Sequence, residues 1–229
     1  MKIAIITAME KECDPIYKRL GSVIGSESAG GMTIYRFAVG DNDVFLLSCG
    51  IGEIQAAAAT QLVIDKYDVE LIVNLGFVGS LVPELKAGDV CFVERVVHHQ
   101  FDVSGIDGVK RGQLGKHSDI YFYLDRQKVL ALQSKLPDKL PFVTLASGDE
   151  FICDRKKKDK LVKDFAAEIC DMELAGIAIT AKKNGVSVLS IKLVSDNADE
   201  NAAMSYNDFI KEGLLKMEGA IGILLGILH

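Results

Sequence analysis

Short apolar runs alternate along the chain with longer segments whose apolar residues recur at helical spacing. The short runs predict strands and the longer segments predict helices. No repeat, low-complexity tract or proline-rich linker interrupts the alternation, which favours one α/β domain over residues 1–229. The predicted strands are residues 2–7, 32–39, 43–49, 70–75, 89–99, 142–146, 168–171 and 186–194. The predicted helices are residues 9–20, 53–66, 125–136, 172–184 and 206–229.

Two features of the predicted strands indicate a mixed sheet. Residues 33–37 and 43–48 are joined by Gly40-Asp41-Asn42, a connection short enough for an antiparallel hairpin. The runs 71–73 and 188–191 are almost continuously apolar, as strands covered on both faces should be. In sheets of this kind the ligand usually sits outside the carboxyl ends of the strands. The residues that follow each strand are therefore the first candidates for a site.

Three of these strand ends carry a carboxylate. Glu12 lies at the edge of the apolar stripe of the first helix, Glu173 opens a later helix, and Asp196 follows the last strand. Each has an ordinary explanation as a first-turn carboxylate or as part of a capped helix or turn, with Asp171 as the cap beside Glu173. Carboxylates gathered in one cleft shift each other's pKa values apart, so that one acts as an acid and another as a base.

Two glycine-rich segments, Gly50-Ile51-Gly52 and Gly76-Phe77-Val78-Gly79, are predicted as turns on the same edge. The first begins like a dinucleotide-binding fingerprint, but Gln55 replaces the third glycine, so the match is weak. Phe151 follows another strand end, where a phenylalanine is usually a core residue. Residues 155–160 hold five basic residues in six and predict the solvated start of a helix.

Charge and composition limit the function classes. With 26 basic and 32 acidic residues, the chain lacks the basic face that nucleic acids or anionic lipids require. No stretch reaches the roughly 18 apolar residues of a membrane span. The five cysteines are scattered and form no C-x-x-C pair, which is typical of reduced, buried thiols in a cytoplasm. The adjacent His98 and His99 face opposite sides of a strand, so we expect no metal site.

Six motifs follow one another along nearly the whole chain. They are Ala8-Met9-Glu10-Lys11-Glu12, Ser48-Cys49-Gly50-Ile51-Gly52, Asn74-Leu75-Gly76-Phe77-Val78-Gly79, Ser147-Gly148-Asp149-Glu150-Phe151-Ile152, Asp171-Met172-Glu173 and Val194-Ser195-Asp196. In order and in approximate spacing, these motifs resemble the 5′-methylthioadenosine/S-adenosylhomocysteine nucleosidases of the nucleoside phosphorylase and hydrolase-like group. The resemblance implies a three-layer α/β/α domain with a mixed, twisted central sheet, no cofactor and a homodimer.

The resemblance implies hydrolysis of the N-glycosidic bond between adenine and a 5′-thio-substituted ribose. Glu12 matches the base that activates the water, and Asp196 matches the acid that protonates the departing purine at N7. Glu173 matches the carboxylate that holds the ribose hydroxyls, beside Met172. The other residues implied to bind substrate are Phe151, Ile152 and Gly79 at the purine, Ile51, Met9 and Tyr206 at the ribose and alkylthio group, and Phe77 and Ser195.

Two departures from the family pattern leave the substrate open. Phe77 stands where relatives usually place a small hydroxyl residue, and its ring would fill space or displace a water beside the sugar. The segment 100–106 also differs, so that Ile106 replaces an aromatic contact in a loop that closes the pocket across the dimer in the family. Methylthioadenosine, S-adenosylhomocysteine, adenosine, 5′-deoxyadenosine and futalosine all remain candidate substrates.

Two further functions remain open. A nucleoside phosphorylase of the same fold would need cationic or backbone donors for phosphate, and no arginine precedes Arg19 near Glu12. A non-catalytic purine or dinucleotide-binding protein would have no use for three carboxylates around a neutral sugar, each costly to desolvate.

Overall fold

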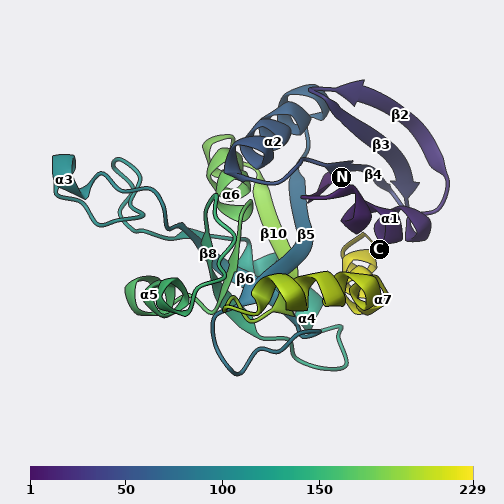
Figure 1. Cartoon of the computed structure of the whole chain (residues 1–229). Coiled ribbons are helices and arrows are strands. Elements are labelled where there is room, and N and C mark those ends of the chain that lie inside the picture. The colour runs from purple at the N-terminus through teal and green to yellow at the C-terminus, as the bar shows by residue number, and fades with distance from the viewer. Residues whose placement is uncertain (229) are drawn as a thin grey trace.

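The computed structural model describes residues 1–228, apart from the side chains of residues 107, 210–216 and 218. Figure 1 shows the helices wrapped around a central sheet, with one arm that carries α3 extending away from the body. The strands are β1 (Lys2–Thr7), β2 (Val23–Ala29), β3 (Met32–Val39), β4 (Asn42–Ser48), β5 (Leu71–Ser80), β6 (Val90–His98), β7 (Phe122–Tyr123), β8 (Phe142–Ser147), β9 (Ile169–Asp171) and β10 (Ser187–Asp196). The helices are α1 (Glu10–Arg19), α2 (Glu53–Tyr67), α3 (Ser104–Asp107), α4 (Arg126–Gln133), α5 (Arg155–Phe165), α6 (Leu174–Lys183) and α7 (Ala202–Leu228).

The sheet is mixed, and part of it closes on itself. Its strand order is β10-β6-β8-β9-β5-β1-β4-β3-β2, and β7 pairs with β6. β1 runs parallel to β4 and β5, whereas β3 runs antiparallel to β4 as the hairpin predicted. Because β10 also pairs with β5, the strands β5, β9, β8, β6 and β10 form a closed ring. Closure leaves no free edge in this part of the sheet, so the backbone at the end of β5 is held by β10 on one side and by β9 on the other.

Helices cover both faces of the sheet and give the expected three layers. Residues of α2 and α6 share one buried apolar cluster with the sheet, and residues of α1, α4 and α7 share a second cluster on the opposite face. A smaller third cluster lies under α5. The helices other than α3 place buried apolar residues against the sheet, whose strand β5 is buried along its whole length.

The predicted strands and helices are all present, but some boundaries and short elements were wrong. β5 continues through Gly76 and Gly79 to Ser80, so the predicted turn there is extended strand. β2, β7 and α3 were missed, because β2 is a largely exposed edge strand and the other two are very short. α7 begins at Ala202 instead of Tyr206, and the predicted helix end at residue 229 lies outside the described residues.

All five cysteines are free, and four of them are buried as predicted. Cys153 is exposed, which corrects the expectation for that residue, because it lies on the short segment between β8 and α5. Among the described residues, every helix is too short or too polar to cross a membrane.

Replacing Leu46 with alanine should destabilise the fold strongly. Leu46 is fully buried in β4 within the cluster under α1 and α7. Leu46→Ala is expected to lower the free energy of unfolding by about 3 kcal/mol, because the lost contacts leave a cavity. Leu130→Ala is the matched control, since Leu130 on α4 is 47% exposed, and it should cost under about 1 kcal/mol. Urea unfolding of the two variants measures the difference, and equal losses would contradict the assignment of the core.

Candidate functional site

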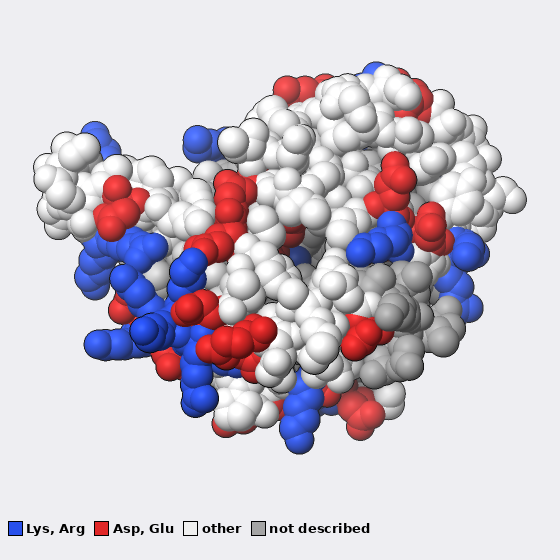
Figure 2. Space-filling view, in the orientation of Figure 1, with Lys and Arg blue, Asp and Glu red and all other residues white. Residues whose placement is uncertain are grey.

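A pocket of about 360 Å³ opens where the ends of β1, β5, β9 and β10 meet. Figure 2 shows it as a hollow in the centre of the displayed face, with charged atoms at its depth. The pocket brings together all twelve residues that the sequence analysis proposed for the site. They are Met9, Glu12, Ile51, Phe77, Gly79, Phe151, Ile152, Met172, Glu173, Ser195, Asp196 and Tyr206. The lining also includes Ala8, Val78, Glu150, Cys170 and Asp171, which the sequence analysis had not assigned to the pocket.

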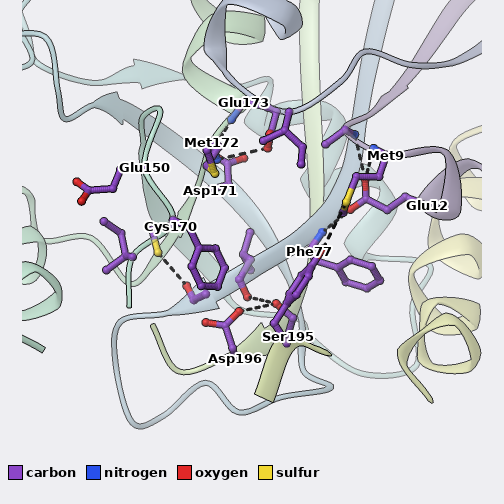
Figure 3. Close-up of a pocket in the computed structure, with 17 residues that line it drawn as sticks. Met9, Glu12, Phe77, Glu150, Cys170, Asp171, Met172, Glu173, Ser195 and Asp196 are labelled. Carbon is purple, nitrogen blue, oxygen red and sulfur yellow. Dashed lines mark hydrogen bonds between the residues drawn. The ribbon is translucent and has the colours of Figure 1, made fainter. Parts of the chain in front are cut away.

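Carboxylates approach the pocket from three sides. In Figure 3, Glu12 lies beside Met9, Glu173 lies beside Asp171, and Asp196 lies beside Ser195, around an open centre. Glu12, Glu173 and Asp196 are all buried. They come from helix, loop and strand segments far apart in the sequence, so the fold assembles the cluster.

Glu12 is held by backbone donors at the start of α1. Its Oε2 accepts hydrogen bonds from the amides of Ala8 (3.0 Å) and Met9 (2.9 Å), and its Oε1 accepts one from the amide of Phe77 (3.1 Å). Burial raises the pKa of Glu12, while these three amides and the Lys192 ammonium act in the opposite direction. Glu12 therefore has a fixed orientation and is a stronger base than a carboxylate on the surface.

The backbone amide of Phe77 donates to Glu12, and this hydrogen bond does not depend on which side chain residue 77 carries. Its ring is 8% exposed and packs edge-on against Phe209 at 5.8 Å and Tyr206 at 6.5 Å between ring centroids. The unusual residue at this position therefore thickens the apolar wall formed with α7, and the hydrogen bond to Glu12 is retained.

The sequence left open whether the carboxylates at the start of α6 cap the helix or face a cleft, and the structure shows one residue in each role: Asp171 binds the helix amides and Glu173 lines the pocket. Asp171 Oδ1 accepts from the amides of Glu173 and Leu174, both at 3.3 Å, so Asp171 does cap the start of α6. Glu173 itself occupies the N-cap position and its Oε1 accepts from the Gly52 amide at 3.1 Å. Burial, with the nearby Asp171 charge, raises the pKa of Glu173 to about 7. Near neutral pH this carboxylate can therefore hold or release a proton.

Asp196 lies in the last residue of β10, beside a bulge that interrupts its pairing with β5. Such bulges change the direction in which a side chain points. The Oδ1 of Asp196 accepts a hydrogen bond from the Ala198 amide at 2.9 Å, and the Ser195 hydroxyl lies 2.8 Å from the Oδ2 of Asp196. Burial raises the pKa of Asp196 and favours the protonated acid, against the pull of these donors. Asp196 therefore both binds the amide of the turn that follows it, as the sequence suggested, and lines the pocket.

Lys192 is the functional residue that the sequence analysis missed. Its Nζ donates to Asp171 Oδ2 at 2.7 Å, and both side chains are buried. Burial disfavours the ammonium, but Asp171, Glu173 and Glu12 outweigh burial and raise the pKa of Lys192. The signal was present, because Lys192 is the one charged residue in the apolar run 186–194. It supplies the positive charge that a cluster of buried carboxylates needs.

Side chains of the pocket pack closely against two glycines of β5, and a larger residue at either position would crowd them. A Cβ at Gly76 would lie 3.2 Å from Glu12 Oε1, and a Cβ at Gly79 would lie 3.1 Å from both Asp196 Oδ1 and the Ala198 side chain. These positions have ordinary extended backbone, so the lack of a side chain is what matters. Gly50 and Gly52, in contrast, form a true turn with φ of +89° and +108°.

Glu53 is a further buried acid and lies behind the pocket. Its Oε2 accepts a short hydrogen bond from the Gly176 amide, and its Oε1 has no partner among the described residues. Burial, then the Asp171 charge, raises the pKa of Glu53 to about 8. No group of three or more His, Cys, Asp or Glu in the described part of the chain has the arrangement of a metal site.

The rest of the pocket wall is apolar and aromatic. Phe151 is 42% exposed at the rim, and its ring centroid lies 6.0 Å from that of Tyr206. The Tyr206 hydroxyl lies 3.4 Å from the Met9 sulfur, so α7 and the start of α1 meet at the pocket. A half-exposed phenylalanine at a pocket rim has a free face for a flat ligand, which corrects the core position expected for Phe151.

Known proteins of one family are similar to this chain over nearly its whole length. Residues 2–228 match the family model described as Phosphorylase superfamily. A 5′-methylthioadenosine/S-adenosylhomocysteine nucleosidase of Exiguobacterium sp. is 31% identical over 217 residues, which cover 92% of this chain and 91% of the relative. An aminodeoxyfutalosine nucleosidase of Helicobacter pylori is 29% identical over 216 residues, or 92% of each chain. The crystal structure of the H. pylori 5′-methylthioadenosine/S-adenosylhomocysteine nucleosidase with butyl-thio-DADMe-Immucillin-A has a TM-score of 0.92 and 28% identity, covering 100% of this chain and 97% of that chain.

The free energy of unfolding should depend on pH through Glu53. Because its pKa is raised in the folded state, the folded chain binds more protons than the unfolded chain between about pH 4.5 and 8, so stability falls as pH rises through this window. Glu53→Gln removes that loss. The stability of the variant relative to the parent should therefore increase from pH 5 to 8, by up to about 1.4 kcal/mol per pH unit.

Urea unfolding at several pH values measures this difference. Glu84→Gln is the matched control, because Glu84 is exposed, and its relative stability should not change with pH. Parallel pH curves for Glu53→Gln and the parent would contradict the raised pKa.

Proposed function

The chain belongs to the phosphorylase superfamily, and from that premise we propose that it is a nucleosidase that hydrolyses 5′-methylthioadenosine and S-adenosylhomocysteine to adenine and the thioribose product. The observation that carries the proposal is the pocket in which Glu12, Glu173 and Asp196 face one another. We further propose that residues 1–229 act as one domain. No step of the proposed reaction uses a cofactor.

Asp196 is proposed as the acid that protonates the purine at N7. Adenine leaves poorly as an anion, so a proton delivered as the glycosidic bond breaks lowers the barrier. Support comes from the burial that raises the pKa of Asp196 and from Ser195, which holds one carboxyl oxygen at 2.8 Å. Gly79, which is proposed to contact the purine, leaves room for Asp196, because a Cβ at this position would lie 3.1 Å from Asp196 Oδ1.

Glu12 is proposed as the base that takes a proton from the attacking water. The three amide donors leave its carboxylate in one orientation, and its raised pKa makes proton transfer from water easier. The water oxygen then bonds to the anomeric carbon while the electrons of the glycosidic bond move to the purine. The sugar passes through a state of oxocarbenium character, which buried negative charge stabilises more than it stabilises the neutral substrate.

The remaining lining residues are proposed to position the nucleoside. Glu173 accepts hydrogen bonds from the ribose hydroxyls, with Met172 packed against the sugar. Phe151 stacks on the adenine, and the backbone of Ile152 and Gly79 recognises its edge. Support comes from the half-exposed ring of Phe151 and from the polarity of the pocket, which is charged at the depth and apolar at the wall.

The 5′ substituent is proposed to lie against Met9, Ile51, Phe77 and Tyr206. All four line the pocket, and three of them offer a sulfur or an aromatic ring. Thioether sulfur packs favourably against aromatic rings and against methionine. An apolar wall of this kind suits an alkylthio group better than a free 5′ hydroxyl, whose hydrogen bonds it could not replace.

Water is favoured over phosphate as the nucleophile. The described lining residues include no arginine or lysine, and the nearest buried ammonium, that of Lys192, is already paired with Asp171. A phosphate anion beside the Glu12 carboxylate would be repelled. The pocket therefore fits hydrolysis better than phosphorolysis.

Aminodeoxyfutalosine is the second candidate substrate. Relatives with that name match this chain at 28% to 29% identity over 92% of its length, close to the values for the methylthioadenosine enzymes. The two substrates share the adenine nucleoside and differ in the group attached at the 5′ position. The same acid, base and ribose carboxylate would serve for both.

A homodimer in the cytoplasm is also proposed. Ile106 on α3, at the end of the arm, is 84% exposed and Ile54 at the start of α2 is 80% exposed, so both apolar side chains are accessible to a second copy of the chain. In a single chain Ile106 does not line the pocket. The free, mostly buried thiols support a reducing compartment.

Base release from a nucleoside panel tests the proposed function. We expect adenine and free thioribose from 5′-methylthioadenosine and S-adenosylhomocysteine at the same rate with and without phosphate, with products identified by mass. Faster release from aminodeoxyfutalosine would favour the second candidate. Phosphate-dependent formation of ribose 1-phosphate would instead identify a phosphorylase, and no release from any nucleoside would contradict both candidates.

Asp196→Asn and Glu12→Gln test the two proton transfers. Each is expected to lower kcat by about 10²-fold or more while the melting temperature stays close to that of the parent. Because Asp196 must be protonated, kcat/KM of the parent should fall as pH rises through its raised pKa. Glu10→Gln is the control, since Glu10 is an exposed residue on the same helix as Glu12. Near-normal turnover in both site variants would refute the assigned roles.

A further inference from the structure

One residue of the basic run at the start of α5 is not a solvated surface charge. Lysine and arginine side chains gather over α5 in Figure 2. Lys156 in this run is exposed, whereas Lys158 is half-buried. The Nζ of Lys158 donates to two backbone carbonyls, that of Asn197 at 2.6 Å and that of Ser80 at 3.0 Å. The sequence expectation for residues 155–160 is therefore wrong at this position.

The two carbonyls bound by Lys158 flank the proposed acid. Asn197 directly follows Asp196, and Ser80 directly follows Gly79, whose backbone pairs with Asp196. The Ala198 amide that binds Asp196 belongs to the same turn, in which Ala198 has a φ of +50°. A left-handed alanine is strained and has to be held by its surroundings. Lys158 is such a restraint, because its ammonium joins this turn to the end of β5.

Lys158 also contributes charge. Groups that interact electrostatically with Asp196 include Asp199 in the same turn, Lys158 on α5, Cys170 on β9 and Tyr206 on α7. The Asp199 carboxylate raises the pKa of Asp196, whereas the Lys158 ammonium lowers it. Lys158 is the only positive charge among these four groups.

We propose that Lys158 is a positioning residue for Asp196, holding the turn that follows the acid against the end of β5 so that the carboxyl group faces the departing base. This proposal rests on the proposed function of Asp196 as the general acid. Lys158 does not line the pocket, so it acts through Asp196 and the turn. Helix α5 follows the segment that carries Phe151 and Ile152. The two hydrogen bonds of Lys158 therefore connect this segment with the end of β5 and with the turn after Asp196.

Lys158→Met tests the proposal, with 5′-methylthioadenosine as substrate. We expect kcat to fall about 10-fold or more with KM changed less than about twofold. A misplaced acid stabilises the transition state less, whereas it has little effect on the binding of the substrate. Loss of the ammonium should also move the alkaline limb of the pH profile of kcat/KM to higher pH. Lys158→Arg, which keeps the charge and donors, should restore part of kcat and return the limb toward its position in the parent.

Lys156→Met is the matched control on the same helix and should change neither kcat nor the pH profile. A purely structural effect of Lys158→Met would lower the melting temperature and the active fraction without moving the alkaline limb. If Lys158→Met folds poorly, Lys158→Gln replaces it. Unchanged kcat and an unchanged limb in a folded variant would overturn the proposal.

A spectroscopic readout separates this proposal from the proposed function. The carboxyl carbon of Asp196 is titrated by NMR in the parent and in Lys158→Met. A higher pKa in the variant supports the contact even if the parent releases no base, an outcome that would defeat the proposed function alone. An unchanged pKa of Asp196 would overturn the role of Lys158.

Discussion

The site depends on one buried ion pair, that between Lys192 and Asp171. Carboxylates at Glu12, Asp171 and Glu173 lie close enough to Lys192 to raise its pKa, and all of them are removed from solvent. Burying such a cluster without a positive charge would protonate most of it or destabilise the fold by several kcal/mol. The ammonium of Lys192 lets an ionised base, a ribose carboxylate and a helix cap share one small volume. It achieves this from the interior of β10, where the closed ring of strands holds the lysine stem in place.

Backbone groups do much of the orienting. Amides of residues 8, 9 and 77 bind Glu12, the amide of residue 52 binds Glu173, and the amide of residue 198 binds Asp196. Backbone donors lose little conformational freedom when they bind, so they fix a carboxylate at low entropic cost. A backbone amide can donate whatever its side chain is, so the phenylalanine at position 77 keeps the hydrogen bond from its amide to Glu12. Its ring changes the shape of the 5′ wall, so the departure from the family pattern bears on specificity and leaves the geometry of the base intact.

Four of the buried carboxylates in or behind the pocket, Glu12, Glu53, Glu173 and Asp196, have raised pKa values and differ in their partners. Glu12 has three amide donors, Asp196 has one amide and a hydroxyl, and Glu173 has the Gly52 amide and the repulsion of Asp171. Glu53 accepts a hydrogen bond from the Gly176 amide, and burial first, then the Asp171 and Glu173 charges, raise its pKa to about 8. Burial raises the pKa of both Glu12 and Asp196, but three amides and the Lys192 ammonium favour the ionised form of Glu12, whereas Asp196 has one amide and one hydroxyl.

The sequence by itself determined which segments form the main strands and helices and that the sheet is mixed, because apolar periodicity is a local property. The residues that line the pocket were implied by the resemblance to a family. Glu173 follows β9, which pairs antiparallel with β5, so only the fold shows that its carboxylate meets those of Glu12 and Asp196. The tertiary structure decided the rest. Gly76 and Gly79 proved to be strand residues, because their need is space for Glu12 and Asp196, which no local pattern records. The partners of Lys192 and Lys158 lie 21 or more residues away along the chain. Whether a lysine is solvated, paired or bound to a turn depends on what the fold brings to it.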